Sequence, residues 1–401
     1  MRKTYETKLK RLRGVVFWVA LFSLTGNVQA LPKNTNHRNT EYVSMIEKCD
    51  VITTLKCSPV RIFAEEKSRS RKPLFIKLQT SDDMEVRAKM AEALGQIGGE
   101  GVREALIKAA ETNLSSKVKF SAIEALGKLQ DRETLPFLES KLKEDGVAMR
   151  IAAANALSSA GFPDAIPALI EASGHYHPKS KASVLDALGT LGKGTPGVAE
   201  IVLNMLGNMT LPWSVHNRAM VAVESLGLKE AGPLVIGFLN HKQTELVGRA
   251  CRTLGALKLD YATPSLLHVM KNSSINGGIA AIALIHTKDD EVTNTVNWAG
   301  MNPDLTFRVR RQFFRSMALR KSSKSVRPLS TLLGSSEDQL VILTLETLGQ
   351  LGHPSAGPGI RPLLEHSSDE IRSHAEWAME QISGLKHGGN LEAWDTWLKS
   401  L

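Results

Sequence analysis

A seven-residue pattern recurs along this chain and limits the folds open to it more than any other feature. It reads EALGQIG at Glu92–Gly98 and returns as EALGKLQ at 124, DALGTLG at 186, ESLGLKE at 224 and ETLGQLG at 346. When the leucine of each copy is taken as an anchor, successive anchors lie about 32 residues apart. Self-similarity at this period indicates a stack of small helical units rather than one closed core.

The anchors have small neighbours, because the residue before each anchor is small and six anchors are followed directly by glycine. They are Leu94, Leu126, Leu157, Leu188, Leu226, Leu254, Leu284, Leu319, Leu348 and, with methionine in that place, Met379. A small side chain lets two helices approach closely while the leucine fills the groove between them. We expect the glycine to lie near the end of its helix and to ease the exit of the chain.

Each unit contains a second amphipathic segment. In the first unit, EGVREALIKAAE at 100–111 places Val102, Leu106 and Ala109 on one helical face. Most later copies have a proline near their start, where its missing N–H costs nothing. No stretch shows the sustained alternation of a strand. The sequence therefore predicts an all-α fold, an α-solenoid of about ten helix pairs over 73–385 with a cap at each end.

The copy VRAKMAEALGQIG at 86–98, and more loosely VKFSAIEALGKLQ at 118–130, resembles the short HEAT repeat of the phycobilisome-lyase type. The resemblance covers about residues 73–385 and implies a solenoid whose LG-bearing helices line the concave side. HEAT-like proteins serve many functions, and a few are enzymes. The deoxyhypusine hydroxylase family binds iron through repeated His-Glu pairs, and this chain contains no His-Glu dipeptide.

The search for catalytic motifs yields little. His175 and His177 could chelate a metal from a loop, but no carboxylate or third histidine nearby completes a site, so solvated turn residues are the simpler interpretation. Neither a G-x-S-x-G elbow nor a glycine-rich phosphate loop is present. We expect a non-enzymatic interaction scaffold without metal or cofactor. The alternative is an enzyme or lyase-like maturation factor whose groups converge in the concave groove.

The N-terminus has the three parts of a secretory signal peptide at 1–30. A basic run, MRKTYETKLKRLR, precedes the apolar run Gly14–Leu24, and Val28 and Ala30 form a small-residue cleavage site. The apolar run is shorter than the roughly 20 residues that span a bilayer. We expect export to the periplasm or beyond, in a bacterium, with a mature protein that does not span the membrane. An uncleaved N-terminal anchor is the alternative.

Two further segments flank the repeats. Residues 31–72 predict an N-terminal arm or cap with a basic linker, in which Cys49 and Cys57 could form a disulfide in an oxidising compartment. Cys251 lies in an apolar helical pattern and is expected to be a buried free thiol. Residues 386–401 place Trp394 and Trp397 on one apolar stripe, which favours a capping helix over a docking segment.

The charge of +9 is concentrated at the N-terminus, because residues 1–30 carry +5 and leave +4 for the rest of the chain. This balance argues against a nucleic-acid partner. Basic residues also recur seven positions before an anchor, where we expect them to pair with acids in adjacent turns. They are Arg87, Lys119, Arg150, Lys181 and Arg372.

One basic stretch is a candidate binding site. No acid occurs from Leu305 to Ser336, and Arg308, Arg311 and Arg315 share one helical face. Clustered like charge favours an anionic partner such as an acidic protein segment. An envelope polymer or lipid headgroup is the alternative, as is simple balance by acids such as Asp289, Asp290, Glu291 and Glu337. The candidate partner-binding residues are Arg308, Arg311, Arg315, Arg320 and Lys324.

Overall fold

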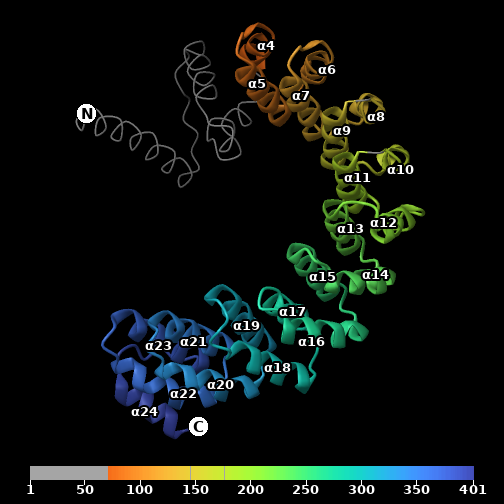
Figure 1. Ribbon diagram of the computed structural model, residues 1–401. Coiled ribbons are helices and arrows are strands. Elements are labelled where there is room, and N and C mark those ends of the chain that lie inside the picture. Colours follow the sequence, from red (N-terminus) through yellow and green to blue (C-terminus); the bar gives the residue numbers. More distant parts are fainter. Residues whose placement is uncertain (1–70, 145, 176) are drawn as a thin grey trace, which may run out of the picture.

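The computed structural model describes residues 71–144, 146–175 and 177–401, which form α-helices and short 3-10 helices without a strand. The helices stack in two layers along an open arc from α4 to α24 (Figure 1). This arrangement confirms the all-α solenoid. The predicted signal peptide and the cysteine pair Cys49 and Cys57 lie outside the described residues.

The concave side of the arc is lined by the helices that carry the repeated signature (Figure 1), called the inner helices below. The inner helices are α5 (Met84–Ile97), α7 (Ser116–Lys128), α9 (Val147–Ala160), α11 (Pro178–Leu191), α13 (Trp213–Leu226), α15 (Thr244–Leu257), α17 (Gly277–Ala283), α19 (Phe307–Arg320), α21 (Asp338–Leu351) and α23 (Asp369–Ser383). This placement agrees with the expectation from the repeat type.

The outer helices alternate with the inner ones and are shorter. They are α4 (Arg71–Thr80), α6 (Val102–Thr112), α8 (Leu135–Leu142), α10 (Ile166–Ser173), α12 (Val198–Gly207), α14 (Gly232–Gly237), α16 (Thr263–Asn272), α18 (Asp290–Gly300), α20 (Val326–Ser330), α22 (Gly357–Ile360) and the last helix, α24 (Leu391–Lys399). A 3-10 turn precedes or extends many of them, as in Arg132–Thr134, Pro163–Ala165, Lys229–Ala231, Phe238–Asn240, Asp260–Ala262, Ser323–Ser325, Thr331–Gly334, Pro354–Ala356 and Arg361–Glu365. Five of these outer helices, α8, α10, α14, α16 and α22, have proline at their first or second position, where the sequence predicts it.

Two of the predicted anchors are wrong. Leu319 is 50% exposed and Leu226 is only partly buried, whereas Met317 and Val223 are fully buried. Val223 and Met317 are the eleventh residues of α13 and α19, the same place that Leu94 holds in α5. The repeat is therefore more regular than the sequence pattern suggests. The ESLG motif misleads because Gly227 has φ +71° and ends α13 in the left-handed region.

The other signature glycines have a different role from the one expected. Gly127 lies inside α7, and an added Cβ there would lie 2.4 Å from the carbonyl oxygen of Ala156 in α9. Similar close approaches join Gly95 to Ala125, Gly189 to Ala222 and Gly255 to Ala283, with nearest contacts of 2.6–2.9 Å. These glycines do not ease the exit of the chain. They allow the backbones of neighbouring inner helices to pack directly against each other.

Larger side chains separate the outer helices. Tyr261 packs over Gly232 of α14, and Trp397 and Leu398 pack over Gly357 of α22. Because the inner helices approach more closely than the outer ones, the stack bends toward the inner side. The small residues beside each anchor thus account for both the repeat and the curvature of the arc.

Three of the five basic residues seven positions before the anchors act as helix caps. Arg150 donates from Nη1 to the carbonyl oxygen of Glu144 at 2.6 Å, and Lys181 donates from Nζ to that of Ser173 at 2.8 Å. Arg372 donates to the carbonyl of Ser367 and also pairs with Asp369. Pairing with acids, the expected role, is thus secondary to satisfying carbonyl oxygens that the preceding outer helix leaves free.

Correcting the eighth anchor adds one residue to this set of caps. Arg310 now lies seven positions before Met317, and it donates from Nη2 to the carbonyl oxygen of Asn302 at 3.1 Å. The side chain is 8% exposed. Arg310 therefore belongs to the structural set and not to the exposed basic face.

The last helix, α24, covers the end of the stack. Trp394 is fully buried and donates from Nε1 to the carbonyl oxygen of Gly388. Arg361 holds Asp395 of α24 through two bonds of 2.6 and 2.9 Å, and the bonded guanidinium lowers the pKa of Asp395. In the described part of the chain, no helix combines the length and apolarity needed to cross a membrane.

Candidate partner-binding surface

The exposed faces of the inner helices form a continuous inner surface along the arc. The positions that face it most directly lie nine, five and two residues before each anchor and two residues after it. In α5 these positions hold Glu85, Lys89, Glu92 and Gln96, and none of the four is fully buried. The composition of this surface decides what the solenoid can bind.

Ion pairs cross this surface from one inner helix to the next. Glu92 lies 3.4 Å from Lys128, Asp186 lies 3.5 Å from Arg218, and Glu85 pairs with Lys117. Glu224 also lies 3.5 Å from Arg249. Over α5–α15 the charges are thus largely balanced across the seams between repeats, where each exposed pair contributes little to stability.

Two carboxylates in the middle of inner helices, Glu124 and Asp186, are partly withdrawn from water. Burial raises the pKa of Glu124, opposed by its hydrogen bond to Asn155, and burial also raises the pKa of Asp186 against the lowering effect of Arg218. Carboxylates at these positions are therefore costly to keep charged without a partner. The inner surface is less polar than its sequence suggests.

The predicted basic residues divide into two groups. Arg320 is half-buried and donates to the carbonyl oxygens of Leu284 (2.7 Å) and Asp289 (3.1 Å). Lys324 lies 2.6 Å from Asp290, one of the acids expected to balance the stretch. Arg320 therefore joins α19 to the end of α17 and the start of α18, and Lys324 forms a surface ion pair with α18. Their proposed part in partner binding stays untested.

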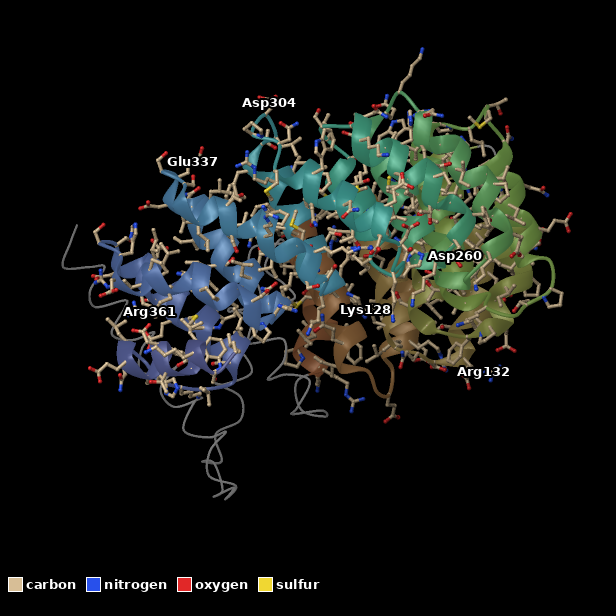
Figure 2. The ribbon with its side chains drawn as sticks, turned by 90° about the horizontal axis from the view of Figure 1, so that it is seen from below. Lys128, Arg132, Asp260, Asp304, Glu337 and Arg361 are labelled. Atoms are coloured by element: carbon tan, nitrogen blue, oxygen red, sulfur yellow. The ribbon has the colours of Figure 1, made fainter. Side chains whose placement is uncertain are left out.

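Arg308, Arg311 and Arg315 differ, because all three are exposed on α19 and form no ion pair or hydrogen bond with any described residue. The acids on either side of α19, Asp304 and Glu337, lie together at one edge of the arc (Figure 2). Neither acid forms an ion pair with these arginines. Arg308, in the first turn of α19, also opposes the helix dipole.

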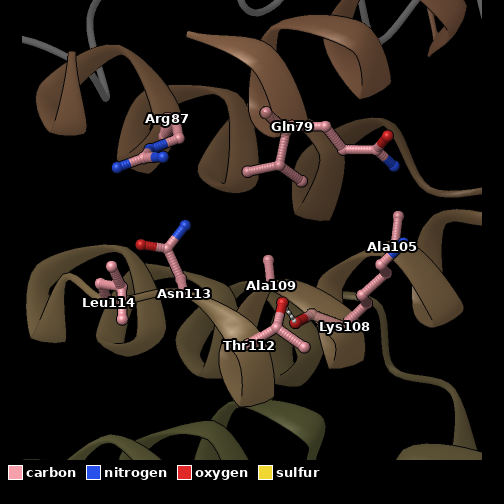
Figure 3. A pocket seen from close by; sticks show the side chains of 9 residues that line it. Gln79, Arg87, Ala105, Lys108, Ala109, Thr112, Asn113 and Leu114 are labelled. Carbon is pink, nitrogen blue, oxygen red and sulfur yellow. Dashed lines mark hydrogen bonds between the residues drawn. The ribbon is translucent and has the colours of Figure 1, made fainter. Parts of the chain in front are cut away.

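Two pockets outside the inner surface are the candidates for a catalytic site. The first, of about 340 Å³, lies between α4, α5 and α6, where Arg87 faces Asn113 across the opening (Figure 3). Thr112 donates to the carbonyl oxygen of Lys108 within it. No carboxylate lines this pocket, so it lacks the acid and base pair that proton-transfer chemistry needs.

The second pocket, of about 570 Å³, lies between α16 and α18. It contains both signs of charge, but its polar groups serve the fold. Lys271 lies 3.5 Å from Glu291, and Asp289 accepts a hydrogen bond from the backbone of Glu291 as the N-cap of α18. These bonds leave the pocket without a free pair of groups aimed at a common point.

The two loop histidines are likewise structural. The Nε2 atom of His175 lies 2.9 Å from the carbonyl oxygen of Leu142, and Nδ1 of His177 accepts from the backbone N–H of Lys179 at the start of α11. Within the described ranges no group of three or more histidine, cysteine or carboxylate side chains is placed to hold a metal ion.

A curved stack of paired helices, in which small residues let neighbouring helices pack closely, defines the class of α-solenoids. Within this class, the family of HEAT repeats matches residues 72–158, and the PBS lyase HEAT-like repeat matches residues 149–175. Residues 72–175 thus match HEAT repeats, the last of them of the PBS lyase HEAT-like type. No curated protein matches the chain by sequence.

Solved structures show the same fold. Kap95p in complex with RanGDP shares 13% sequence identity with this chain at a TM-score of 0.60. The match covers 93% of this chain and 59% of that chain. Importin beta in an ammonium sulfate condition shares 10% sequence identity with this chain at a TM-score of 0.59. The match covers 90% of this chain and 58% of that chain. This chain therefore spans less than two thirds of both neighbours.

Proposed function

We propose that this protein is an exported, non-enzymatic scaffold that binds a protein partner on the inner surface of its solenoid. The observation that carries the proposal is the exposed arginine face of α19, which lies on that surface without compensating acids. An unpaired cluster of like charge costs folding free energy unless a partner of opposite charge covers it. Protein binding is also what the Kap95p complex with RanGDP displays on a similar fold.

The export part of the proposal rests on residues 1–30, whose basic run, apolar run and cleavage site are those of a signal peptide. N-terminal sequencing of the protein from its native host, after cell fractionation, tests this part. A first residue near Leu31 in the exported fraction is expected. An intact Met1 in the cytosolic fraction would contradict it.

The scaffold part is tested by affinity capture through a C-terminal tag on the full chain expressed in its native host. Two baits are compared, the natural protein and an Arg311→Glu/Arg315→Glu variant with unchanged circular dichroism. We expect a stoichiometric protein to be captured by the natural chain and to protect inner helices from hydrogen exchange. Loss of that protein with the variant places its binding on α19.

Two outcomes would contradict the scaffold. Protection confined to outer helices would mean that the partner binds the convex side. Capture of no protein, together with a copurifying chromophore or metal and a measurable turnover, would favour an enzyme or lyase-like maturation factor. Absorption spectra and metal analysis of the purified chain distinguish these cases.

A further inference from the structure

The charges on the inner surface follow a rule that depends on the position two residues before the anchor. Glu92, Asp186 and Glu346 occupy this position, and each lies 3.4–3.6 Å from a base on the next inner helix. The bases Lys128, Arg218 and His374 stand either five residues before the next anchor or two after it. Three of the four acids in this position therefore pair with a base across the seam, and the fourth, Glu124, is hydrogen-bonded to Asn155 instead.

The rule is reversed in the middle of the arc. Arg252 in α15 and Arg315 in α19 occupy the position two residues before their anchors, Leu254 and Met317. The next helix has no acid at the two positions that hold the bases elsewhere, five residues before its anchor and two after it. These positions hold Ile279 and His286 for Arg252, and Leu343 and Gln350 for Arg315.

Arg252 shows the consequence of this reversal. Partial burial and the neighbouring Arg249 both lower the pKa of Arg252, and Glu224 on the preceding inner helix offsets them only in part. Glu224, the acid closest to it in the sequence pattern, is already engaged by Arg249 at 3.5 Å and by the hydroxyl of Thr253 at 2.5 Å.

Between the two arginines lies an apolar strip on α17. Ile282 takes the position two residues before its anchor and is partly exposed, and Ile275, two residues before the start of α17, is 56% exposed. Leu319, the residue wrongly predicted as an anchor, is 50% exposed on α19. Gly278 lets α17 pack against Gln312 of α19, so this strip adjoins the arginine face.

No acid occurs in the sequence between Asp260 and Asp289, nor between Asp304 and Glu337, so α17 and α19 carry none. The N-terminal part of the chain is a poor complement as well. Residues 31–70 contain seven lysines and arginines against five acids, and residues 1–30 are more basic still. The charge needed to cover this surface must therefore come from another molecule.

We propose that the surface over α15–α19 binds an extended protein segment with acidic residues on both sides of an apolar one, and this rests on the proposed scaffold function. The acids would meet Arg252 on one side and Arg315 with Arg308 and Arg311 on the other. The apolar residue would cover Ile275 and Ile282. A longer acidic segment would reach Asp186 on one side and Glu346 on the other. Repulsion between like charges disfavours such a segment.

The spacing of the helices sets the length of the segment. Neighbouring packed helices lie about 8–10 Å apart, so the two arginine rows stand roughly 20 Å from each other. An extended chain advances about 3.3 Å per residue, which places the acidic groups about six residues apart. The apolar residue then lies about midway between them.

The test uses a fluorescein-labelled peptide of about nine residues, with two glutamates at each end and one leucine at the centre. Fluorescence anisotropy measures its binding to the full chain. Charge reversal in Arg252→Glu/Arg315→Glu is expected to weaken binding at least about tenfold, and Ile282→Ser at least about threefold. Binding should also weaken as salt rises.

A matched control carries the same change in net charge elsewhere. Lys242 and Arg327 are exposed, on an edge loop and on the outer helix α20, and Lys242→Glu/Arg327→Glu should leave binding within about twofold of the natural chain. Equal weakening by both double variants would reduce the effect to net charge and overturn the proposal. So would a peptide with serine in place of leucine that binds as well as the original.

The outcome separates this inference from the scaffold function. A natural partner whose hydrogen-exchange footprint falls on α5–α13, with no binding of the acidic peptide, would keep the scaffold and refute the site. Binding of anionic lipid vesicles instead of the peptide, lost in the same double variant, would assign the surface to a membrane. Absence of both a captured protein and peptide binding would refute both proposals.

Discussion

The seam between α7 and α9 offers the most direct test of why the signature repeats. In Gly127→Ala, the new Cβ would lie 2.4 Å from the carbonyl oxygen and 2.5 Å from Cα of Ala156. Ordinary contact begins near 3.4 Å, so the helices must separate by about 1 Å. Backbone atoms cannot rotate away as a flexible side chain could.

The expected magnitude combines two opposing terms. Overpacking of a rigid contact costs about 3 kcal/mol at the upper end of its usual range, and alanine in place of glycine inside a helix returns about 1 kcal/mol. The net loss of local stability is about 2 kcal/mol at this seam. This loss raises the equilibrium constant for local opening roughly thirtyfold. In a stack with nearest-neighbour coupling, the loss is concentrated in α5–α9.

Hydrogen exchange with mass spectrometry, read peptide by peptide, measures this local opening. Gly237→Ala is the control, because Gly237 has φ −55° and an added Cβ meets no atom within 4 Å. This control should exchange no faster than the natural chain. Unchanged exchange of α7 and α9 in Gly127→Ala would refute close helix approach as the reason for the repeated glycine.

Other predictions follow from single sites. Burial raises the pKa of the Cys251 thiol to about 12, so in a Cys49→Ser/Cys57→Ser background a maleimide at pH 8 should label Cys251 only after denaturation. Burial raises the pKa of Glu124. In the ordinary carboxyl range of pH, the folded chain therefore holds a proton that the unfolded chain releases. Because of this difference, the stability of the folded chain falls as pH rises through that range. Glu124→Gln should therefore melt no lower than the natural chain at pH 7, and its advantage should vanish near pH 4, as scanning calorimetry can measure. Trp394→Ala should cost about 3–5 kcal/mol and speed exchange in α23 but not in α5.

The caps between layers give one more prediction. Arg150→Ala removes the donor to the carbonyl oxygen of Glu144 and should cost about 1–2 kcal/mol in chemical denaturation. Arg327→Ala, which removes an exposed arginine from α20, should cost within about 0.5 kcal/mol. Equal losses in the two variants would remove capping as the reason for the repeated basic position.

The fold could be predicted from the sequence because each repeat carries its own evidence. The period and the small residues beside Leu94 and Leu126 suffice to predict a solenoid, and proline marks the outer helices. The predicted anchors Leu226 and Leu319 are wrong because the sequence motif alone does not distinguish a leucine packed between two inner helices from a leucine at the end of a helix. The role of Gly127 could not be predicted, since close approach depends on the neighbouring helix.

Only part of the proposed binding surface could be predicted from the sequence, for the same reason. Arg308, Arg311 and Arg315 stand out as a local cluster, but Arg252 and Ile282 are more than 25 residues away and join them only through the stacking register. With the eighth anchor at Leu319, Arg315 is displaced from the row that it shares with Arg252. Correct anchors at Val223 and Met317 would have aligned the row.

The caps also define where one module of this protein ends and the next begins. Arg150, Lys181 and Arg372 belong to inner helices, yet each holds the end of the segment that leads from the outer helix before it. The indivisible module is therefore an outer helix followed by its inner helix. Duplication or excision in this phase keeps every cap with its carbonyl, so gene-level gain and loss of repeats should have their boundaries after inner helices.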